Sequence, residues 1–389
     1  MYKRLILLLI ISMSFISGVC QNVGDKKNLT KETNEWLNRL KNAGKEGRPY
    51  YSQFDEYRAR NTGELKSSYQ AKTGVTLQVN GHDLYYASGT WFTKKSVVTS
   101  RANLISIVKA AWKEYGALPC FSWHLENPYV PTGYEQSMGC RYRYSVDGYP
   151  EEHRYVIKEI LEGTGSVCGM GNRSGTDNAV TYRNPSEWFD ARCREVAEII
   201  KEFVTDDGKP IPIILRLWHE CEDSWQWWGK QSVSAEDFKS FFRLTVDKIE
   251  QYTQTHNIIF AYCPDRYWST EDGFMRRYPG DDYVDMIGFD DYSIGSTEQA
   301  LEKTVSRAKI VSRIANERDK AAALFETANS KDTNSECFFC DFLAKILQTE
   351  GVNLGLIQIW STSKLSTEGQ INDRVTFLKS GLVRTYDNK

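Results

Sequence analysis

Residues 211–220 read IPIILRLWHE, and this stretch of the sequence decides the fold. Apolar residues, several of them β-branched, fill its first eight positions apart from Arg216. A run of this kind, without the alternation of a half-exposed strand, predicts a strand that is covered on both faces. It ends in His219 and Glu220, two side chains that carry chemistry. Buried strands with reactive C-terminal ends are typical of parallel α/β proteins.

Seven further segments predict strands, and most of them are followed by a helical pattern. They are residues 48–54, 75–82, 118–124, 257–264, 283–290, 322–327 and 355–360. Eight predicted strands, most of them followed by a helix, indicate a single (β/α)₈ TIM barrel over residues 36–389. A doubly wound open sheet is the alternative, but no glycine-rich phosphate fingerprint follows any of the strands.

Apolar residues recur at helical spacing between the predicted strands. The predicted helices cover residues 104–112, 188–203, 297–318, 335–350 and 372–380, and a further helix begins near Ser234. There Ser234 and Asp237 have the spacing of a capping box, in which each side chain bonds the backbone of the other residue.

The first twenty residues are typical of a signal peptide. Lys3 and Arg4 precede an apolar core that is too short to span a bilayer as a permanent helix. A buried N-terminal helix is the alternative. Residues 21–35 are polar and predict a flexible segment. Cys20 is a candidate lipid-attachment site, although Val19 is a poor match to the small residue preferred there, so we expect a periplasmic, extracellular or lipid-anchored protein.

Eight cysteines remain beyond Cys20, an even number that permits disulfide bonds in an exported chain. The sequence does not select one pairing, and we favour Cys140 with Cys168 because both lie in one long loop region. Cys337 and Cys340 have the C-x-x-C spacing of redox and zinc sites, but no second pair or nearby histidine completes a metal set. A structural role is therefore predicted for them.

Charge and aromatic content narrow the class of partner. The net charge is −2 and no long basic run appears, which argues against nucleic acid and anionic membrane surfaces. The 11 Trp and 22 Tyr residues, many near predicted strand ends, suit a site that stacks on flat apolar faces such as sugar rings. We expect a monomer that contacts a membrane only if Cys20 carries a lipid.

Two glutamates end predicted strands on nearly opposite sides of the barrel. Glu220 follows the fourth strand and Glu326 ends the seventh. Glycoside hydrolysis uses one carboxylic acid to protonate the leaving oxygen and a second carboxylate across the anomeric carbon, about 5–5.5 Å away in retaining enzymes. Two strand-end carboxylates in ordinary salt bridges are the alternative, and spacing alone leaves both interpretations open.

The sequence around Glu220 favours the first interpretation. RLWHE (216–220) is followed by CEDSWQWWG (221–229), and this stretch resembles glycoside hydrolase family 26, whose acid/base lies in an Arg-x-x-His-Glu segment before Trp-rich sequence. The resemblance extends in family order to SWHLENP (122–128), GFDDY (288–292), LFET (324–327) and IQIW (357–360). It implies a retaining glycoside hydrolase on a TIM barrel.

The resemblance also implies roles for individual residues. It makes Glu220 the acid/base and Glu326 the nucleophile, with Tyr292 bonded to the nucleophile. Arg216 shares a strand face with Glu220, where its guanidinium would help to hold a carboxylate ionised. No metal and no cofactor are expected, because two carboxylates suffice for this route. The residues expected to bind substrate are His124, Arg216, His219, Trp225, Asp290, Tyr292 and Trp360.

Several neighbouring residues stay without an assigned role. Trp227 and Trp228 suit the packing of the loop as well as sugar binding. Glu222 is expected in a solvated loop, and Asp265 and Asp291 remain ambiguous.

The resemblance implies β-mannan as substrate, including glucomannan and galactomannan, cut either internally or with release of mannobiose. Mixed-linkage β-glucan and β-1,3-xylan are alternatives within the same family, and a catalytically silent carbohydrate-binding barrel is the alternative outside it. Residues 128–184 form a long insertion, and loops of this length are usually functional. We interpret it as a wall at the glycone end of the cleft.

Overall fold

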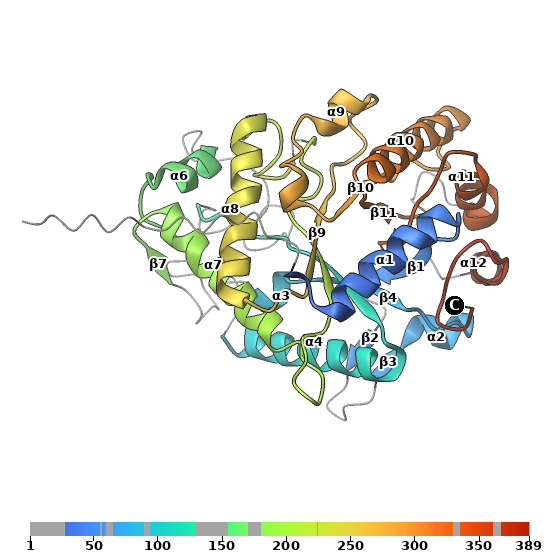
Figure 1. Ribbon diagram of the computed structural model, residues 1–389, viewed down its shortest axis with the longest axis horizontal. Helices are drawn as coiled ribbons and strands as arrows, with labels where there is room; N and C mark the ends of the chain where they lie inside the picture. The colour runs from blue at the N-terminus through green and yellow to red at the C-terminus, as the bar shows by residue number, and fades with distance from the viewer. Residues whose placement is uncertain are drawn as a thin grey trace, which may run out of the picture.

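The computed structural model describes residues 28–54, 57–59, 65–88, 94–129, 155–169, 180–223, 225–329, 335–360 and 367–388. Within these residues, eight parallel strands close into a barrel with the neighbour order β1-β12-β11-β10-β9-β8-β5-β4, so the predicted TIM barrel is confirmed (Figure 1). All eight predicted strands are present. They are β1 (Tyr50–Phe54), β4 (Val79–Asp83), β5 (Leu118–Ser122), β8 (Ile213–Arg216), β9 (Ile258–Tyr262), β10 (Met286–Asp290), β11 (Ala321–Thr327) and β12 (Leu356–Ile359).

Helices surround the barrel (Figure 1). Two small antiparallel pairs accompany them, β2 (Tyr57–Ala59) with β3 (Leu65–Ser67) and β6 (Cys168–Gly169) with β7 (Thr181–Tyr182). The helix predicted at 335–350 is a π-helical turn, Phe338–Leu343, that continues as α11. The α-helices are α1 (Lys31–Lys45), α2 (Ser68–Thr73), α3 (Tyr85–Ser88), α4 (Lys94–Tyr115), α6 (Val156–Glu162), α7 (Pro185–Lys201), α8 (Ala235–Thr253), α9 (Glu271–Met275), α10 (Glu298–Glu317), α11 (Ala344–Gln348) and α12 (Glu368–Lys379).

The helix starts show which capping signals the chain uses. Ser234 begins α8 as predicted, because its Oγ accepts a hydrogen bond from the backbone N–H of Asp237 at 3.0 Å. The Asp237 carboxylate bonds the Ser234 hydroxyl at 2.8 Å, so the reciprocal half of the predicted capping box is absent there. Thr367 and Gln370 form the complete box, and α12 therefore starts before the predicted residue 372.

The helix α1 closes the N-terminal end of the barrel. The flexible segment predicted over residues 21–35 is wrong from Lys31 onward, and residues 21–27 lie outside the described part of the chain. Thr30 starts the helix by accepting a hydrogen bond from the backbone N–H of Thr33 at 3.2 Å. Along the sequence, the polar residues of the outer helix face interrupt an apolar stripe. This stripe is buried against the first residues of the barrel strands and consists of Trp36, Leu37, Leu40 and Ala43.

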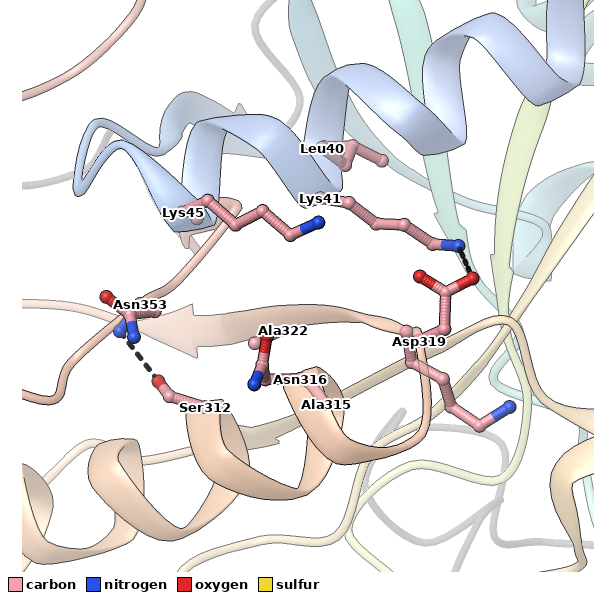
Figure 2. A pocket seen from close by; sticks show the side chains of 11 residues that line it. Leu40, Lys41, Lys45, Ser312, Ala315, Asn316, Asp319, Ala322 and Asn353 are labelled. Atoms are coloured by element: carbon pink, nitrogen blue, oxygen red, sulfur yellow. Dashed lines mark hydrogen bonds and ion pairs between the residues drawn. The ribbon is translucent and has the colours of Figure 1, made fainter.

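A small hollow lies between α1 and α10 at this same end of the barrel (Figure 2). Its volume is about 50 Å³, which holds a few water molecules and no sugar ring. Lys41 Nζ donates to the Asp319 carboxylate at 2.8 Å, and the backbone N–H of Asn353 donates to Ser312 Oγ at 2.8 Å. The hollow is therefore separate from the chemistry predicted at the opposite ends of the strands.

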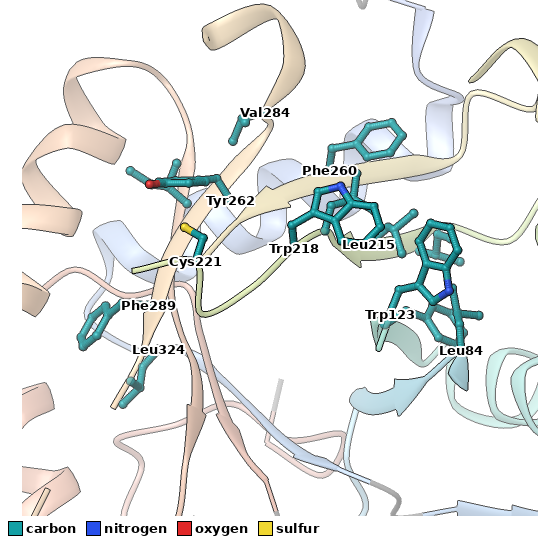
Figure 3. Packing of buried hydrophobic residues seen from close by; sticks show 14 of the residues in the cluster. Leu84, Trp123, Leu215, Trp218, Cys221, Phe260, Tyr262, Val284, Phe289 and Leu324 are labelled. Atoms are coloured by element: carbon teal, nitrogen blue, oxygen red, sulfur yellow. The ribbon is translucent and has the colours of Figure 1, made fainter. Parts of the chain in front are cut away.

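A tryptophan-rich layer lies between the barrel and its outer helices (Figure 3). The rings of Trp123 and Trp218 lie 5.3 Å apart, and both side chains are buried. Trp218 Nε1 donates to Thr245 Oγ1 at 3.0 Å, and Trp123 Nε1 donates to Ser88 Oγ at 3.2 Å. Each indole is thus buried with its one donor satisfied, which fixes the chain just before His219.

The predicted signal peptide and Cys20 lie outside the described residues. Among the helices that are described, none combines the length and the apolar character needed to cross a bilayer.

The seven cysteines within the described ranges are free thiols. Cys168 is one of them, and Cys140, its favoured partner in the sequence, lies outside those ranges. Burial, with Glu159 and Glu187 nearby, raises the pKa of the Cys168 thiol to about 12 and keeps it protonated.

Candidate active site

Three charged residues from three strands form the floor of the C-terminal mouth. Arg216 ends β8, Asp290 ends β10 and Glu326 lies near the end of β11. Arg216 Nη1 donates to both oxygens of Asp290 at 2.9 and 2.8 Å, and its Nη2 donates to Oε1 of Glu326. Burial opposes the charged guanidinium, but the two carboxylates outweigh it and raise the pKa of Arg216 well above its usual range. Arg216 is thus a permanent cation between two acids.

Glu326 is held from both sides. Its Oε1 accepts from Arg216, and its Oε2 accepts from the Tyr292 hydroxyl at 2.6 Å, the contact that was predicted. Burial, and then the nearby carboxylates, raise the pKa of Tyr292 well above its usual range, so the phenol keeps the proton it donates. Two donors on two oxygens fix one orientation and stabilise negative charge on Glu326.

Glu220 projects from a strained turn after β8. Trp218 and Glu220 have left-handed backbone conformations, with φ of 49° and 57°, which non-glycine residues rarely adopt. The backbone N–H of Glu220 donates to the carbonyl of Cys263 at 2.9 Å, and Trp228 Nε1 donates to the carbonyl of His219 at 2.8 Å. These bonds hold the turn in the shape that brings Glu220 to the mouth.

The Glu220 carboxyl group is protonated at neutral pH. Its Oε2 accepts a hydrogen bond from Trp225 Nε1 at 2.8 Å. Burial raises the pKa of Glu220 to about 8, with Glu326 and Asp265 adding to the effect. The two glutamates therefore stand in unlike surroundings, because Glu326 is bonded by the Arg216 guanidinium and Glu220 by the neutral indole of Trp225.

The two glutamates are also close together. One carboxylate oxygen each of Glu220, Asp290 and Glu326 lie within 4.8 Å of one another. This spacing matches the short separation of retaining glycosidases and is below the roughly 6.5–9.5 Å of inverting enzymes. Three such carboxylates are also a potential cation site, but Arg216 already pairs with two of them.

Four rings line the mouth around the glutamates. The centroid of the His124 ring lies 4.6 Å from that of His219, 6.2 Å from that of Trp225 and 6.1 Å from that of Trp360. Trp360 also packs on Phe54 at 4.1 Å. His124, Trp225 and Trp360 are half-buried, so each keeps some surface for a ligand.

Three residues predicted to bind substrate lie beneath this surface instead. The side chains of Arg216 and Asp290 are 0% exposed, and their contacts are to one another and to Glu326 and Cys263. His219 is equally buried, and burial, with Arg216 and His124, lowers its pKa well below the usual range. The expected direct contact with sugar is therefore wrong for Arg216 and Asp290, because neither side chain has exposed surface.

The sequence missed two residues of the site. Asp83 ends β4 and bonds the His124 ring, but the predicted strand stops at His82, one residue short. Cys263 follows β9, and its thiol donates to Asp290 Oδ1 at 3.1 Å. The sequence signal for Cys263 was its position near the end of the strand predicted over residues 257–264.

The residues left open around Glu220 are largely structural. Trp227 and Trp228 are fully buried, so both pack the loop. Glu222 is buried too and pairs with Arg276 and Arg277, which corrects the expectation of a solvated side chain.

Asp291 and Asp265, which the sequence left without an assigned role, differ in whether they act on Glu220. Asp291 is buried, and its carboxylate pairs with Arg307 at 3.0 Å and accepts from Thr304 Oγ1 at 2.7 Å. Asp265 accepts from the backbone N–H groups of Asp223 and Tyr267, yet burial raises its pKa to about 6. Of the two, Asp265 is the one that acts on Glu220.

Relatives of known activity match most of the chain. The model of the family described as Glycosyl hydrolase family 26 matches residues 179–334, which include both glutamates. A mannan endo-1,4-beta-mannosidase of Bifidobacterium adolescentis is 26% identical over 323 residues, 81% of this chain but 29% of that protein. Another from Bacillus subtilis is 26% identical over 307 residues, 74% of this chain and 72% of the relative. The chain thus spans less than a third of the first relative and most of the second.

Solved structures share the fold. GH26C from a Muricauda species superposes with a TM-score of 0.75 and 23% identity, covering 93% of each chain. A GH26 beta-mannanase from Bacteroides ovatus gives a TM-score of 0.73 and 22% identity, covering 92% of this chain and 96% of the other. At these identities the likeness concerns the fold.

A closed (β/α)₈ barrel with two unlike carboxylates at its C-terminal mouth defines the class of TIM-barrel glycoside hydrolases. The family match and the relatives narrow this class further. Within this class, the chain is similar to the mannan endo-1,4-beta-mannosidases above and, over residues 179–334, to glycoside hydrolase family 26.

Proposed function

We propose that this chain is a retaining β-mannan hydrolase in which Glu326 is the nucleophile and Glu220 the acid/base. The observation that carries the proposal is the pair of carboxyl groups within 4.8 Å in unlike surroundings. Arg216 and Tyr292 stabilise charge on Glu326, while burial keeps the proton on Glu220. An acid and a base separated in this way are what glycoside hydrolysis requires.

In the first step, Glu326 attacks the anomeric carbon and forms a covalent ester with the glycone. The bond to the leaving oxygen breaks, and Glu220 gives that oxygen its proton. A pKa of about 8 on Glu220 keeps the proton available at neutral pH. The hydrogen bond from Trp225 then remains on the carboxylate that is left.

In the second step, Glu220 works as a base. The ester has no negative charge on Glu326, so one of the influences that raise the pKa of Glu220 disappears. Glu220 takes a proton from water, the water oxygen attacks the anomeric carbon, and Glu326 leaves as carboxylate. Two inversions at the anomeric carbon give net retention.

The proposed substrate rests on the relatives and on the rings of the mouth. The Bifidobacterium and Bacillus relatives are named mannan endo-1,4-beta-mannosidases. Trp225 and Trp360 offer flat apolar faces beside the glutamates, which suits stacking on sugar rings. We expect β-mannan, glucomannan or galactomannan, bound by a monomer. Mixed-linkage β-glucan and β-1,3-xylan are the alternatives.

A hydrolysis screen over mannan, galactomannan, lichenan and β-1,3-xylan tests the proposal. We expect release of sugars from the mannans, with a first product in the β configuration by proton NMR. Glu326→Ala should lower kcat by at least about 10⁴-fold, because it removes the nucleophile. Glu302→Ala, on the exposed face of α10, is the matched control and should leave kcat unchanged.

Two results would overturn the proposal. A first product in the α configuration would show inversion. Binding of mannan without turnover, equal in the wild type and in Glu326→Ala, would leave the silent carbohydrate-binding barrel.

Mannohexaose distinguishes internal cleavage from release of mannobiose. In the insertion, α6 packs on α7 and α8, while residues 130–154 and 170–179 lie outside the described part. We propose that the insertion walls the glycone end of the cleft. A mixture of early products supports endo action, and disaccharide alone supports a blocked cleft.

We also propose that the protein is exported. The basic start, apolar core and Cys20 of the first twenty residues support a cleaved signal, with lipid attachment as one outcome. The mass of the mature protein from its native host tests this. An uncleaved chain that begins at Met1 would contradict export by this signal.

A further inference from the structure

The Asp83 carboxylate collects four hydrogen bonds at the end of β4. Its Oδ1 accepts from the backbone N–H of Tyr85 at 2.7 Å and of His124 at 3.3 Å. Its Oδ2 accepts from Ser122 Oγ at 2.7 Å and bonds Nδ1 of the His124 ring. Such a carboxylate is fixed in place before any ligand binds.

This carboxylate decides the state of His124. A histidine whose Nδ1 is bonded to a carboxylate carries its proton there and has one ring orientation. Burial opposes a charged imidazole, but Asp83, and then Glu326 and Glu220, raise the pKa of His124 above its usual value. Burial also opposes charge on Asp83, yet His124, Ser122 and Tyr85 lower the pKa of Asp83. The two groups thus form an ion pair with 11% and 12% of their side chains exposed.

We infer that Asp83 is a positioning residue that holds His124 as an imidazolium beside the two glutamates. In this form both ring nitrogens carry protons, so Nε2–H is a donor for a sugar hydroxyl while Nδ1–H stays on Asp83. This inference rests on the proposed function, because the donor serves the sugar of the proposed substrate.

The imidazolium also acts on the acid. The titratable groups that face His124 are Asp83 from β4, His219 and Glu220 from the turn after β8, and Glu326 from β11. Positive charge on His124 lowers the pKa of Glu220 and so opposes the effects of burial and of Glu326. Asp83 therefore helps to limit how high the pKa of Glu220 rises.

A purely structural role is the competing explanation for Asp83. Its bond to the backbone N–H of Tyr85 is a local turn that begins α3, and such turns are common for Asp. That role uses one oxygen and needs no charge. The structural explanation does not account for the contacts that the second oxygen makes with Ser122 and the His124 ring.

Asp83→Asn separates the two roles, because Asn keeps the shape and one acceptor but removes the charge. We expect the alkaline limb of kcat/KM to move up by about one pH unit, since the pKa of Glu220 rises without the imidazolium. At neutral pH, kcat/KM should fall about tenfold, the effect of one lost hydrogen bond from a charged donor. Ser122→Ala should shift the limb in the same direction by less.

Asp373→Asn is the matched control. Asp373 is also buried and accepts from two backbone N–H groups, those of Phe339 at 2.8 Å and Cys340 at 3.0 Å, but it belongs to α12. It should lower the thermal stability without moving the pH profile. An unmoved profile in Asp83→Asn, together with a stability loss like that of Asp373→Asn, would reduce Asp83 to a structural turn.

Histidine NMR tests the ion pair without catalysis. The chain has five histidines, so the imidazole signals of a ¹⁵N-histidine sample can be assigned with His124→Gln. The His124 signal should titrate above the usual value and move down in Asp83→Asn. If the wild type cleaves none of the four polysaccharides, the proposed function fails while this titration still decides the ion pair. A His124 titration equal in both proteins would overturn the inference.

Discussion

The two ends of the barrel differ in the side chains that form them, which are apolar at the N-terminal end and charged at the C-terminal end. At the N-terminal end, α1 lays Leu40 and its apolar neighbours against the first residues of the strands. At the C-terminal end, the same strands finish in a buried ion-pair cluster around Arg216 and in a strained turn at Glu220. The N-terminal end stabilises the fold. The buried charges and the strained backbone of the C-terminal end lower the stability of the fold but fix the geometry of the site. Three predictions test this division.

The largest loss of stability is expected from Leu40→Ala at the closed end. Leu40 is fully buried beneath the barrel, so its truncation leaves a cavity. The free energy of unfolding should fall by about 2–5 kcal/mol in urea denaturation. The kcat of the folded variant should stay at the wild-type value, and a parallel loss of kcat would show that the two ends are coupled.

Tyr292→Phe at the open end should give the converse result. It removes the 2.6 Å hydrogen bond to Glu326 and little else. We expect kcat to fall about 10- to 100-fold, equal to about 1.5–3 kcal/mol for a hydrogen bond to a charged group. KM and the urea midpoint should change little. An unchanged kcat with a raised KM would instead make Tyr292 a binding residue.

The third prediction concerns Glu220→Gln, measured as stability against pH. Burial raises the pKa of Glu220 from 4.5 to about 8, so the folded state favours the protonated form. The wild type therefore loses stability as the pH rises from about 4.5 to 8, and the loss is complete above the folded pKa. Gln does not titrate, so its free energy of unfolding should rise relative to that of the wild type as the pH increases from about 4.5 to 9. A constant difference between pH 5 and 9 would contradict the raised pKa.

Sequence patterns predicted the barrel because its strands are buried on both faces. The apolar run before His219 is an example, and most of the eight strands were found from such runs. The helix α1 was not predicted, because its apolar residues are spaced among charged ones. The apolar stripe stabilises the helix only through its contact with the barrel. The π-helical turn Phe338–Leu343 likewise depends on tertiary packing, which local patterns do not contain.

The sequence predicted most residues of the site but not how deeply each of them is buried. Glu220 and Glu326 were recognised from motifs, and their proximity follows from strands four and seven of a closed barrel. The motifs could not tell which residues face the ligand and which lie below it, so Arg216 and Asp290 were placed one layer too high. Asp83 was lost because strand ends are the least certain part of any such prediction.

The position of α1 determines at which end of the barrel the N-terminal part of the chain joins the fold. The backbone N–H of Thr30 bonds the carbonyl of His256, just before β9, so the chain enters beneath the barrel. Whatever precedes Asn28 joins the molecule at the pole opposite Glu220 and Glu326. If the protein is attached through Cys20, as one outcome of the proposed export, the attachment joins the described chain at the end of the barrel opposite the mouth.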